Sequence, residues 1–343
     1  IETVAYSFGS ICGFNGEELF VGPESAGAHP GPACYGAGGP LTVTDVNLLL
    51  GRLDPGQFGI PVNLEAAREA LEAIRSALPE PTAKEELLAG FLEIANERMA
   101  DAVQKISIRE GYDPAEYALV AFGGAGGQHA CAIAEKLGIS TVLCPSDSGL
   151  LSARGLREAV MERFSERQLL LPLSELTTGL PETIAELEQQ AFGRLLAEGL
   201  EAEKIVIRRR LVSLRHTGQE SAEEIEYRDG IDLTEVFRVR YESLFGYWPE
   251  NKSIEVVSAR VIASTELPPI PTETFDVQTE ATNNEPIIRR ESLTDGSRID
   301  GPSIVQDRFC TISIGEHWQG ILGSNGTIKL LSLIHISEPT RPY

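Results

Sequence analysis

A short apolar run, a loop of five small residues and a helix follow one another near the middle of the chain. Residues 117–122 read YALVAF, and residues 123–127 read GGAGG. The stretch from Gln128 to Leu137 places its apolar side chains on one helical face, and Thr141 to Cys144 form the next apolar run. This order predicts a β-loop-α-β unit whose first strand is buried in a parallel sheet. The chain is therefore expected to have an α/β fold.

The loop between the strand and the helix is suited to binding an anion or a nucleotide. Small residues let a ligand approach the backbone, and the helix N-terminus contributes partial positive charge. The spacing is neither G-x-G-x-x-G, because His129 stands at the third glycine position, nor a Walker A loop, because no G-K-[ST] follows. A tight structural turn is the alternative, and for His129 a hydrogen bond at the helix end is as reasonable as a ligand contact. The candidate nucleotide-binding residues are Gly123, Gly124, Ala125, Gly126, Gly127, Gln128 and His129.

Residues 1–62 are rich in Gly and Pro, which suggests loops shaped around a ligand, with plain surface loops as the alternative. Three residues here are candidates for the substrate side of a site. His29 suits substrate or metal binding or proton transfer, or else a hydrogen bond that fixes the loop. Cys34 suits a thiol nucleophile paired with His29, or buried packing. Asp45 suits a substrate or metal contact, or the cap of a turn. No catalytic residue is assigned from the sequence.

A long helix is expected to begin at Thr82 and to end at Gly111. Apolar side chains from Leu88 to Ile106 recur at helical spacing, which is typical of core packing. Glu85 stands three residues after Thr82, and this spacing predicts a capping box.

Charge and cysteine content exclude several classes of protein. The formal net charge of −22 opposes binding to nucleic acid. The five cysteines form no C-x-x-C pair, so neither a disulfide framework nor a metal site is expected, and reduced cytoplasm is the simplest setting. No apolar stretch approaches the roughly 18 residues that a membrane span needs. The first residues contain neither an initiator Met nor a signal peptide, so we expect a piece of a longer protein.

Composition changes along the chain predict two consecutive domains and a foreign tail. Residues 1–164 are expected to form the first domain, and residues 165–331 a second, mostly β domain. Residues 332–343 read like translated sequencing adapter, and we exclude them from the fold.

Several segments resemble the 5-oxoprolinase/hydantoinase A family. The strand, glycine loop, helix and strand are similar to the adenosine motif of actin-like ATPases, and A-F-G-G-A-G-G-Q-H-A-C resembles the 5-oxoprolinase wording of that motif. The family's G-G-G-S-I appears here as Ser7 to Ile11 with two glycines lost, which weakens any phosphate contact there. The resemblance extends over residues 1–331, but only the first 155 are specific to the family. The further matching segments are Val21–Gly36, Leu41–Leu53, Ser148–Ala153, Leu214–Gln219, Tyr241–Tyr247 and Gly301–Val305.

The resemblance implies the later part of an actin-like ATPase core, followed by a mostly β C-terminal domain. It also implies ATP and Mg²⁺, with the Mg²⁺ ligands and both phosphate loops in a missing N-terminal lobe. The implied reaction is ATP-dependent hydrolysis of a cyclic amide, with phosphorylation of the amide oxygen supplying the drive. His29 and the wording Q-H-A-C favour 5-oxo-L-proline as the substrate and L-glutamate as the product.

Other functions of the same family remain open at this stage. They are a hydantoinase acting on N-methylhydantoin, a ketone carboxylase subunit, and a non-catalytic actin-like binding module. The implied partners are the small cyclic amide, the N-terminal lobe, a hydantoinase B-type half or subunit, and further copies of the chain. Because one lobe of the nucleotide site is absent, the isolated chain is expected to be inactive.

Overall fold

The computed structural model describes residues 9–57, 60–176, 179–267, 272–276 and 287–334. The chain divides into two compact units. Unit 1 comprises Ile1–Ala153 and Pro271–Tyr343, and unit 2 comprises Arg154–Ile270. Unit 2 is therefore inserted in the sequence of unit 1.

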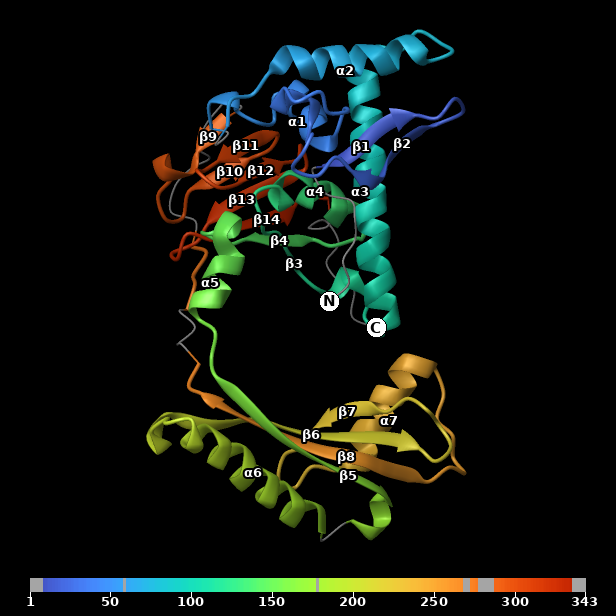
Figure 1. The fold of residues 1–343 in the computed structure, drawn as a ribbon, viewed down its shortest axis with the longest axis vertical. Coiled ribbons are helices and arrows are strands. Elements are labelled where there is room, and N and C mark those ends of the chain that lie inside the picture. Colours follow the sequence, from blue (N-terminus) through green and yellow to red (C-terminus); the bar gives the residue numbers. More distant parts are fainter. Residues whose placement is uncertain (1–8, 58–59, 177–178, 268–271, 277–286, 335–343) are drawn as a thin grey trace. The chain divides into compact units, whose positions relative to one another are not determined.

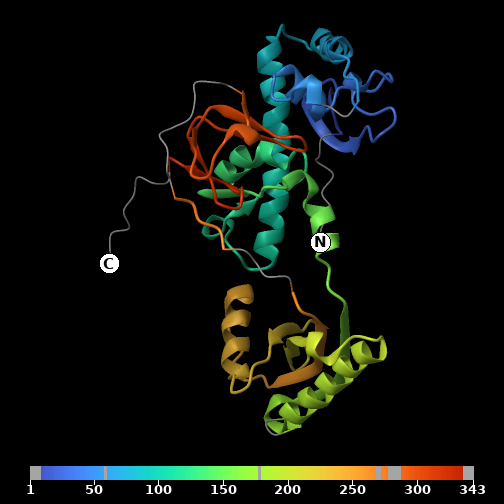
Figure 2. The ribbon, with the colours of Figure 1, turned by 90° about the vertical axis from the view of Figure 1, so that its left-hand side faces the viewer.

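The first part of unit 1 packs a β-hairpin against three helices. Strands β1 (Ser10–Phe14) and β2 (Leu19–Ser25) are antiparallel. Helices α1 (Val43–Leu49), α2 (Leu64–Ala77) and α3 (Lys84–Arg109) cover them with a shared apolar core. Figure 2 shows α3 running along unit 1 beside α4 (Gly126–Lys136), and residues of the two helices are in contact. The first part of unit 1 thus supports one side of the helix that follows the glycine loop.

The second part of unit 1 is a five-stranded sheet in the order β10-β13-β14-β4-β3. Strand β3 pairs in parallel with β4, and β4 pairs antiparallel with β14. Figure 1 shows the last strands of the chain lying beside β4, although unit 2 separates them in sequence. The strands are β3 (Leu119–Val120), β4 (Thr141–Cys144), β10 (Arg298–Asp300), β13 (Trp318–Leu322) and β14 (Ile328–Ser332).

A second, three-stranded sheet completes unit 1. Its order is β12-β11-β9, with β9 (Ile287–Arg289), β11 (Ser303–Gln306) and β12 (Thr311–Ile314). Helix α4 packs on β12, and the core between them includes Ala130, Ile312 and Trp318. The helix that carries the glycine loop is thus held by strands from the C-terminal end of the chain.

Unit 2 is an antiparallel sheet in the order β5-β8-β6-β7 with two helices. Helix α6 packs across β5, β6 and β8, helix α7 packs on β7, and all share one apolar core. The short helix α5 (Leu151–Arg157) spans the boundary between the units. The elements of unit 2 are β5 (Glu162–Pro172), α6 (Gly179–Ala197), β6 (Ile205–His216), β7 (Glu223–Glu226), α7 (Leu233–Phe245) and β8 (Ile254–Thr265).

The structure confirms the expected fold class, but its domain boundaries differ from those expected. The chain is mixed α/β with the predicted β-loop-α-β unit and a strand-rich C-terminal part. However, the expected second domain at 165–331 is not one unit. Its last strands, from β9 onward, belong to unit 1, because β14 forms main-chain hydrogen bonds with β4. A boundary set by composition alone misses a pairing between strands so far apart in sequence.

Two further sequence expectations need correction. Residues 117–122 were expected as a strand buried on both sides, but β3 contains only Leu119–Val120 and Val120 is exposed, because β3 is the outermost strand of the described sheet. The foreign tail was expected to begin at 332, but Ser332 is the buried last residue of β14, and the Leu333 amide donates to His317 O. Leu333 and Ile334 are exposed, and residues 335–343 lie outside the described residues.

Candidate functional site

The glycine loop connects β3 to α4 and offers open space at its first residue. Gly123 has a φ of +86°, and a Cβ added there would meet no atom within 4 Å. Such a φ favours glycine, and the open space leaves the backbone accessible to a ligand. The Gly123 amide donates to Ser148 O at 2.7 Å, which fixes the loop to the segment after β4. The first turn of α4 also has amides that the helix itself does not bond. These features fit the adenosine end of a nucleotide.

Gly127, in contrast, is small because of packing. A Cβ at this position would lie 2.8 Å from Thr311 O and 2.9 Å from a side-chain carbon of Ile312. The helix can therefore approach β12 closely only with glycine there. From the sequence, all five small residues are candidates for one ligand-binding loop. In the structure their roles differ, since Gly123 has open space beside it and Gly127 allows close packing on β12.

Gln128 and His129 point into the protein rather than toward the open side of the loop. Their exposed fractions are 3% and 5%. His129 Nδ1 lies 2.7 Å from Asn96 Oδ1, and its Nε2 lies 3.5 Å from Asn47 Nδ2. His129 therefore links α4 to α3 and α1, which agrees with the hydrogen-bonding alternative for this residue.

Burial determines the charge of His129. Desolvation, followed by the positive charge of Arg52, lowers the pKa of His129 to about 4. The ring is thus neutral at pH 7, with Nδ1 donating to Asn96 Oδ1 and Nε2 accepting from Asn47 Nδ2.

This lowered pKa predicts a pH-dependent stability of unit 1. As the pH falls from 6.5 to 4, the unfolded chain takes up a proton on His129 and the folded chain does not, so stability is lost over that window. The expected loss attributable to His129 is about 3 kcal/mol. It is measured as the pH dependence of urea unfolding, with Trp318 as the reporter in a Trp248→Phe background.

The control for this titration is His129→Gln. This variant should lack the additional loss between pH 6.5 and 4, although it starts from a lower stability. Parallel pH profiles for the two proteins would show that His129 does not titrate as the structure indicates.

Asp45 lies at the centre of the folded Gly/Pro-rich segment. It is fully buried, and its carboxylate accepts hydrogen bonds from the Ala33, Cys34 and Thr42 amides at 3.1, 2.7 and 2.8 Å. The Thr42 hydroxyl donates to it at 2.8 Å, and Thr42 and Asp45 form a capping box for α1. The geometry matches the cap alternative for Asp45, because these donors occupy both carboxylate oxygens.

Cys34 and Asp45 are brought together, and His29 is exposed on the loop after β2. Cys34 is completely buried, and burial together with the neighbouring carboxylate of Asp45 raises the pKa of its thiol far above its usual range. A thiolate nucleophile at Cys34 is therefore disfavoured. Of the three substrate-side candidates, only His29 presents its side chain to solvent.

A second feature of this segment explains part of its glycine content. A Cβ on Gly39 would lie 1.8 Å from Gly31 O, so these two backbone segments lie too close together for a side chain at position 39. All five cysteines are free and buried. Within the described ranges, no group of three or more His, Cys, Asp or Glu side chains is placed to hold a metal ion. No Mg²⁺ site is therefore assigned to the described residues.

The described part of unit 2 contains a cavity of about 780 Å³. It is lined by residues of the segment between β5 and α6, the start of α6, the loop after β7, the start of α7 and the loop before β8, including Leu176, Tyr227, Asp232 and Trp248. None of the candidate residues from the sequence lines it.

In the described part of the chain, no helix is long and apolar enough to cross a membrane.

Comparison with known proteins gives the family. Residues 1–163 match the family described as Hydantoinase/oxoprolinase. The chain is 35% identical to the 5-oxoprolinase PfmaA of Pestalotiopsis fici over 92% of its length, and 33% identical to the 5-oxoprolinase of Dictyostelium discoideum over 96%. The chain belongs to the hydantoinase/oxoprolinase family. It spans 27% and 29% of the length of these two members.

A solved member of similar fold supports this assignment across both units. The crystal structure of the ATP-dependent caprolactamase from Pseudomonas jessenii matches with a TM-score of 0.80 and 28% identity. The match covers 95% of this chain and 52% of the caprolactamase chain. The expected later part of an actin-like ATPase core, with a strand-rich C-terminal part, is thereby confirmed as the fold of this family member.

Sequence reasoning missed one part of the site. The turn Asp307–Cys310 contacts the glycine loop, since the Thr311 amide donates to Gly124 O at 3.3 Å and Phe309 O lies 3.3 Å from where a Cβ on Gly124 would be. The sequence of residues 307–310 contains no motif that indicates a function. Only the pairing of distant strands places this turn beside the loop.

Proposed function

We propose that this chain provides the adenosine-binding part of an ATP-dependent enzyme that hydrolyses a cyclic amide. The observation that carries the proposal concerns Gly123, in the loop that precedes α4. This residue has a positive φ and open space beside it, and the sequence of its loop resembles the adenosine motif. Backbone amides at a helix N-terminus can bind a nucleotide without a charged side chain. The phosphates and Mg²⁺ are assigned to residues outside this chain, because the resemblance to actin-like ATPases implies phosphate loops and Mg²⁺ ligands in an N-terminal lobe.

We propose 5-oxo-L-proline as the cyclic amide and L-glutamate as the product. The names 5-oxoprolinase and caprolactamase both denote action on a lactam, and several curated relatives carry the first name. ATP supplies the drive for opening a resonance-stabilised lactam, and positioning and charge neutralisation are the main tasks of the protein. The exposed His29 is the substrate-side residue of this proposal, whereas Asp45 and Cys34 shape its loop.

We further propose that the complete enzyme contains a second half or subunit. One relative, 29% identical, is named caprolactamase subunit alpha, which is the wording of an assembly with more than one kind of chain. Five buried, free cysteines fit a reducing compartment, so the cytoplasm is the proposed location.

The nucleotide site can be tested in the chain itself with ¹⁵N-glycine labelling. Adding ATP to about 10 mM should shift the amide signals of the loop glycines, because half of a site still binds at about millimolar strength. Glycines of unit 2 such as Gly218 and Gly246 are internal references. No shift of any loop glycine at this concentration would contradict the proposed site.

A matched pair of substitutions sharpens this test. Gly126 has room for a Cβ, with its nearest neighbour at 3.7 Å, so Gly126→Val should fold but place two methyl groups at the loop. The Kd for ATP is expected to rise at least about fivefold. Gly193 lies in α6 with open space around it, so Gly193→Val is the matched control and should leave the Kd unchanged.

A further inference from the structure

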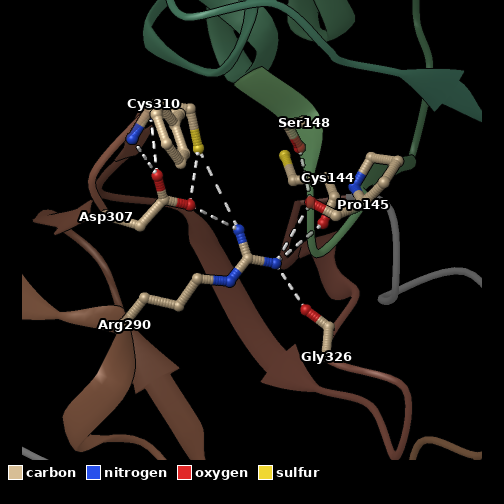
Figure 3. A network of polar contacts seen from close by, with 8 residues as sticks. Cys144, Pro145, Ser148, Arg290, Asp307, Cys310 and Gly326 are labelled. Atoms are coloured by element: carbon tan, nitrogen blue, oxygen red, sulfur yellow. Dashed lines mark hydrogen bonds and ion pairs between the residues drawn. The ribbon is translucent and has the colours of Figure 1, made fainter. Parts of the chain in front are cut away.

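A buried arginine, Arg290, connects the Asp307–Cys310 turn to the segment that follows β4 through an ion pair and hydrogen bonds. The side chain of Arg290 is only 10% exposed, and its Nη1 pairs with Asp307 Oδ2 at 3.2 Å. Its Nη2 donates to Pro145 O at 3.1 Å and to Gly326 O. Figure 3 shows the guanidinium between Asp307 and Cys310 on one side and the backbone carbonyls on the other. A buried charge needs partners of this kind, so these contacts stabilise the turn in the position observed.

Asp307 then fixes the backbone of the turn. Its Oδ1 accepts hydrogen bonds from the Phe309 amide at 2.6 Å and the Cys310 amide at 2.7 Å. The Asp307 amide donates to Cys310 O at 3.0 Å. Phe309 is therefore held in place through its main chain, although its side chain is 48% exposed.

The turn lies against both segments of the proposed nucleotide site. On one side, Phe309 O is close to Gly124, as described above. On the other side, a Cβ on Gly149 would lie 2.3 Å from Phe309 O and 2.5 Å from Phe309 Cβ. Gly149 belongs to the short 3₁₀ segment Ser148–Leu150, whose Ser148 O accepts the Gly123 amide. Three loops thus converge at Phe309.

A single exposed phenylalanine is ordinary, but the main chain of this one is held beside a loop proposed to bind adenosine. Arg308 places its guanidinium 5.2 Å from the ring centre. We propose that Phe309 stacks on the purine base of the bound nucleotide, and that Arg290 is its positioning residue. The proposal rests on the proposed function, and it adds a base contact contributed by the C-terminal strands.

The base contact is tested by titrating the ¹⁵N-glycine-labelled chain with ATP and, separately, with adenosine, which keeps the base and lacks the phosphates. Phe309→Ala is expected to raise the Kd for each ligand about tenfold, the loss typical of one base–aromatic stack. Phe164→Ala is the control, since Phe164 is 54% exposed and Arg260 lies 5.5 Å from its ring centre. It should change neither Kd.

The role of Arg290 is tested by a double-mutant cycle with Phe309. Arg290→Gln should raise the Kd for ATP about threefold or more, but should add nothing in the Phe309→Ala background, because it acts through Phe309. Arg290→Lys, which keeps the positive charge beside Asp307, should restore part of the affinity. Additive effects in the cycle would overturn the positioning role.

The outcomes separate the inference from the proposed function. If the unmodified chain gives no loop shifts with ATP, the nucleotide site itself is contradicted. If the unmodified chain binds ATP and Phe309→Ala binds it equally well, or if the Kd for adenosine is unchanged in Phe309→Ala, only the base contact is overturned.

Discussion

Replacing Asp45 by alanine is expected to lower the free energy of unfolding of unit 1 by about 4 kcal/mol. The carboxylate is fully buried and accepts hydrogen bonds from three backbone amides and one hydroxyl. Alanine leaves those donors buried without an acceptor. The desolvation penalty of these unsatisfied donors accounts for most of the expected loss of stability. The measurement is urea unfolding followed by Trp318 fluorescence in the Trp248→Phe background.

Two variants calibrate this result. Asp45→Asn keeps the size and one acceptor oxygen and should lose about half as much stability. Asp113→Ala removes an exposed cap that accepts only from the Ala115 amide at 3.0 Å, and it should lose about 1 kcal/mol or less. If Asp45→Ala resembled Asp113→Ala, Asp45 would not be a structural cap, and a direct role toward the substrate would regain support.

The isolated chain is expected to release ADP from ATP at least about 1,000-fold more slowly than a complete 5-oxoprolinase, with or without 5-oxo-L-proline. Charge neutralisation at the transferring phosphate is the main contribution of proteins to this chemistry. The chain spans 29% of the length of the Dictyostelium discoideum enzyme, and the phosphate contacts are proposed to lie elsewhere in that length.

The assay compares the purified chain with that complete enzyme under identical ATP and Mg²⁺. Parallel reactions with 5-oxo-L-proline, N-methylhydantoin and caprolactam test the proposed substrate on the complete enzyme. Comparable ADP release by the chain alone would overturn the assignment of the phosphate contacts to residues elsewhere.

The sequence was most informative where the signal was local. The glycine loop between an apolar run and a helix predicted the β-loop-α-β unit, which is found as β3, α4 and β4. The helical spacing from Leu88 to Ile106 predicted the existence of α3, and the expected bounds Thr82 and Gly111 lie two residues outside its ends. Local hydrogen bonding and periodic burial determine these elements, so a single sequence is sufficient to locate them.

Capping was harder to predict than the helices themselves. The expected capping box of Thr82 and Glu85 is wrong, because α3 begins at Lys84 after Ala83, which forms no side-chain cap. The capping box that does form joins Thr42 and Asp45. A short polar side chain can satisfy several backbone groups, and tertiary packing selects among them.

The parts of the site that were missed depend on contacts between distant segments. Arg290 and Asp307 have ordinary charged side chains in the sequence. They follow β9 and β11 of the three-stranded sheet, and only the fold brings them together and places Arg290 beside the Pro145 carbonyl. The inward direction of Gln128 and His129 likewise depends on how α4 packs against α3. Periodicity along one segment carries no information on such pairings.

The insertion of unit 2 between β4 and β14 sets an order of events during synthesis. When β4 leaves the ribosome, its partner β14 does not yet exist, and the whole of unit 2 must be translated first. At about 5–20 residues per second, this delay is on the order of 10 seconds. Unit 2 has its own core and can fold in that time, while β4 keeps an unpaired edge that invites association with other chains. The nascent chain is therefore most prone to aggregation between the emergence of β4 and the arrival of β14.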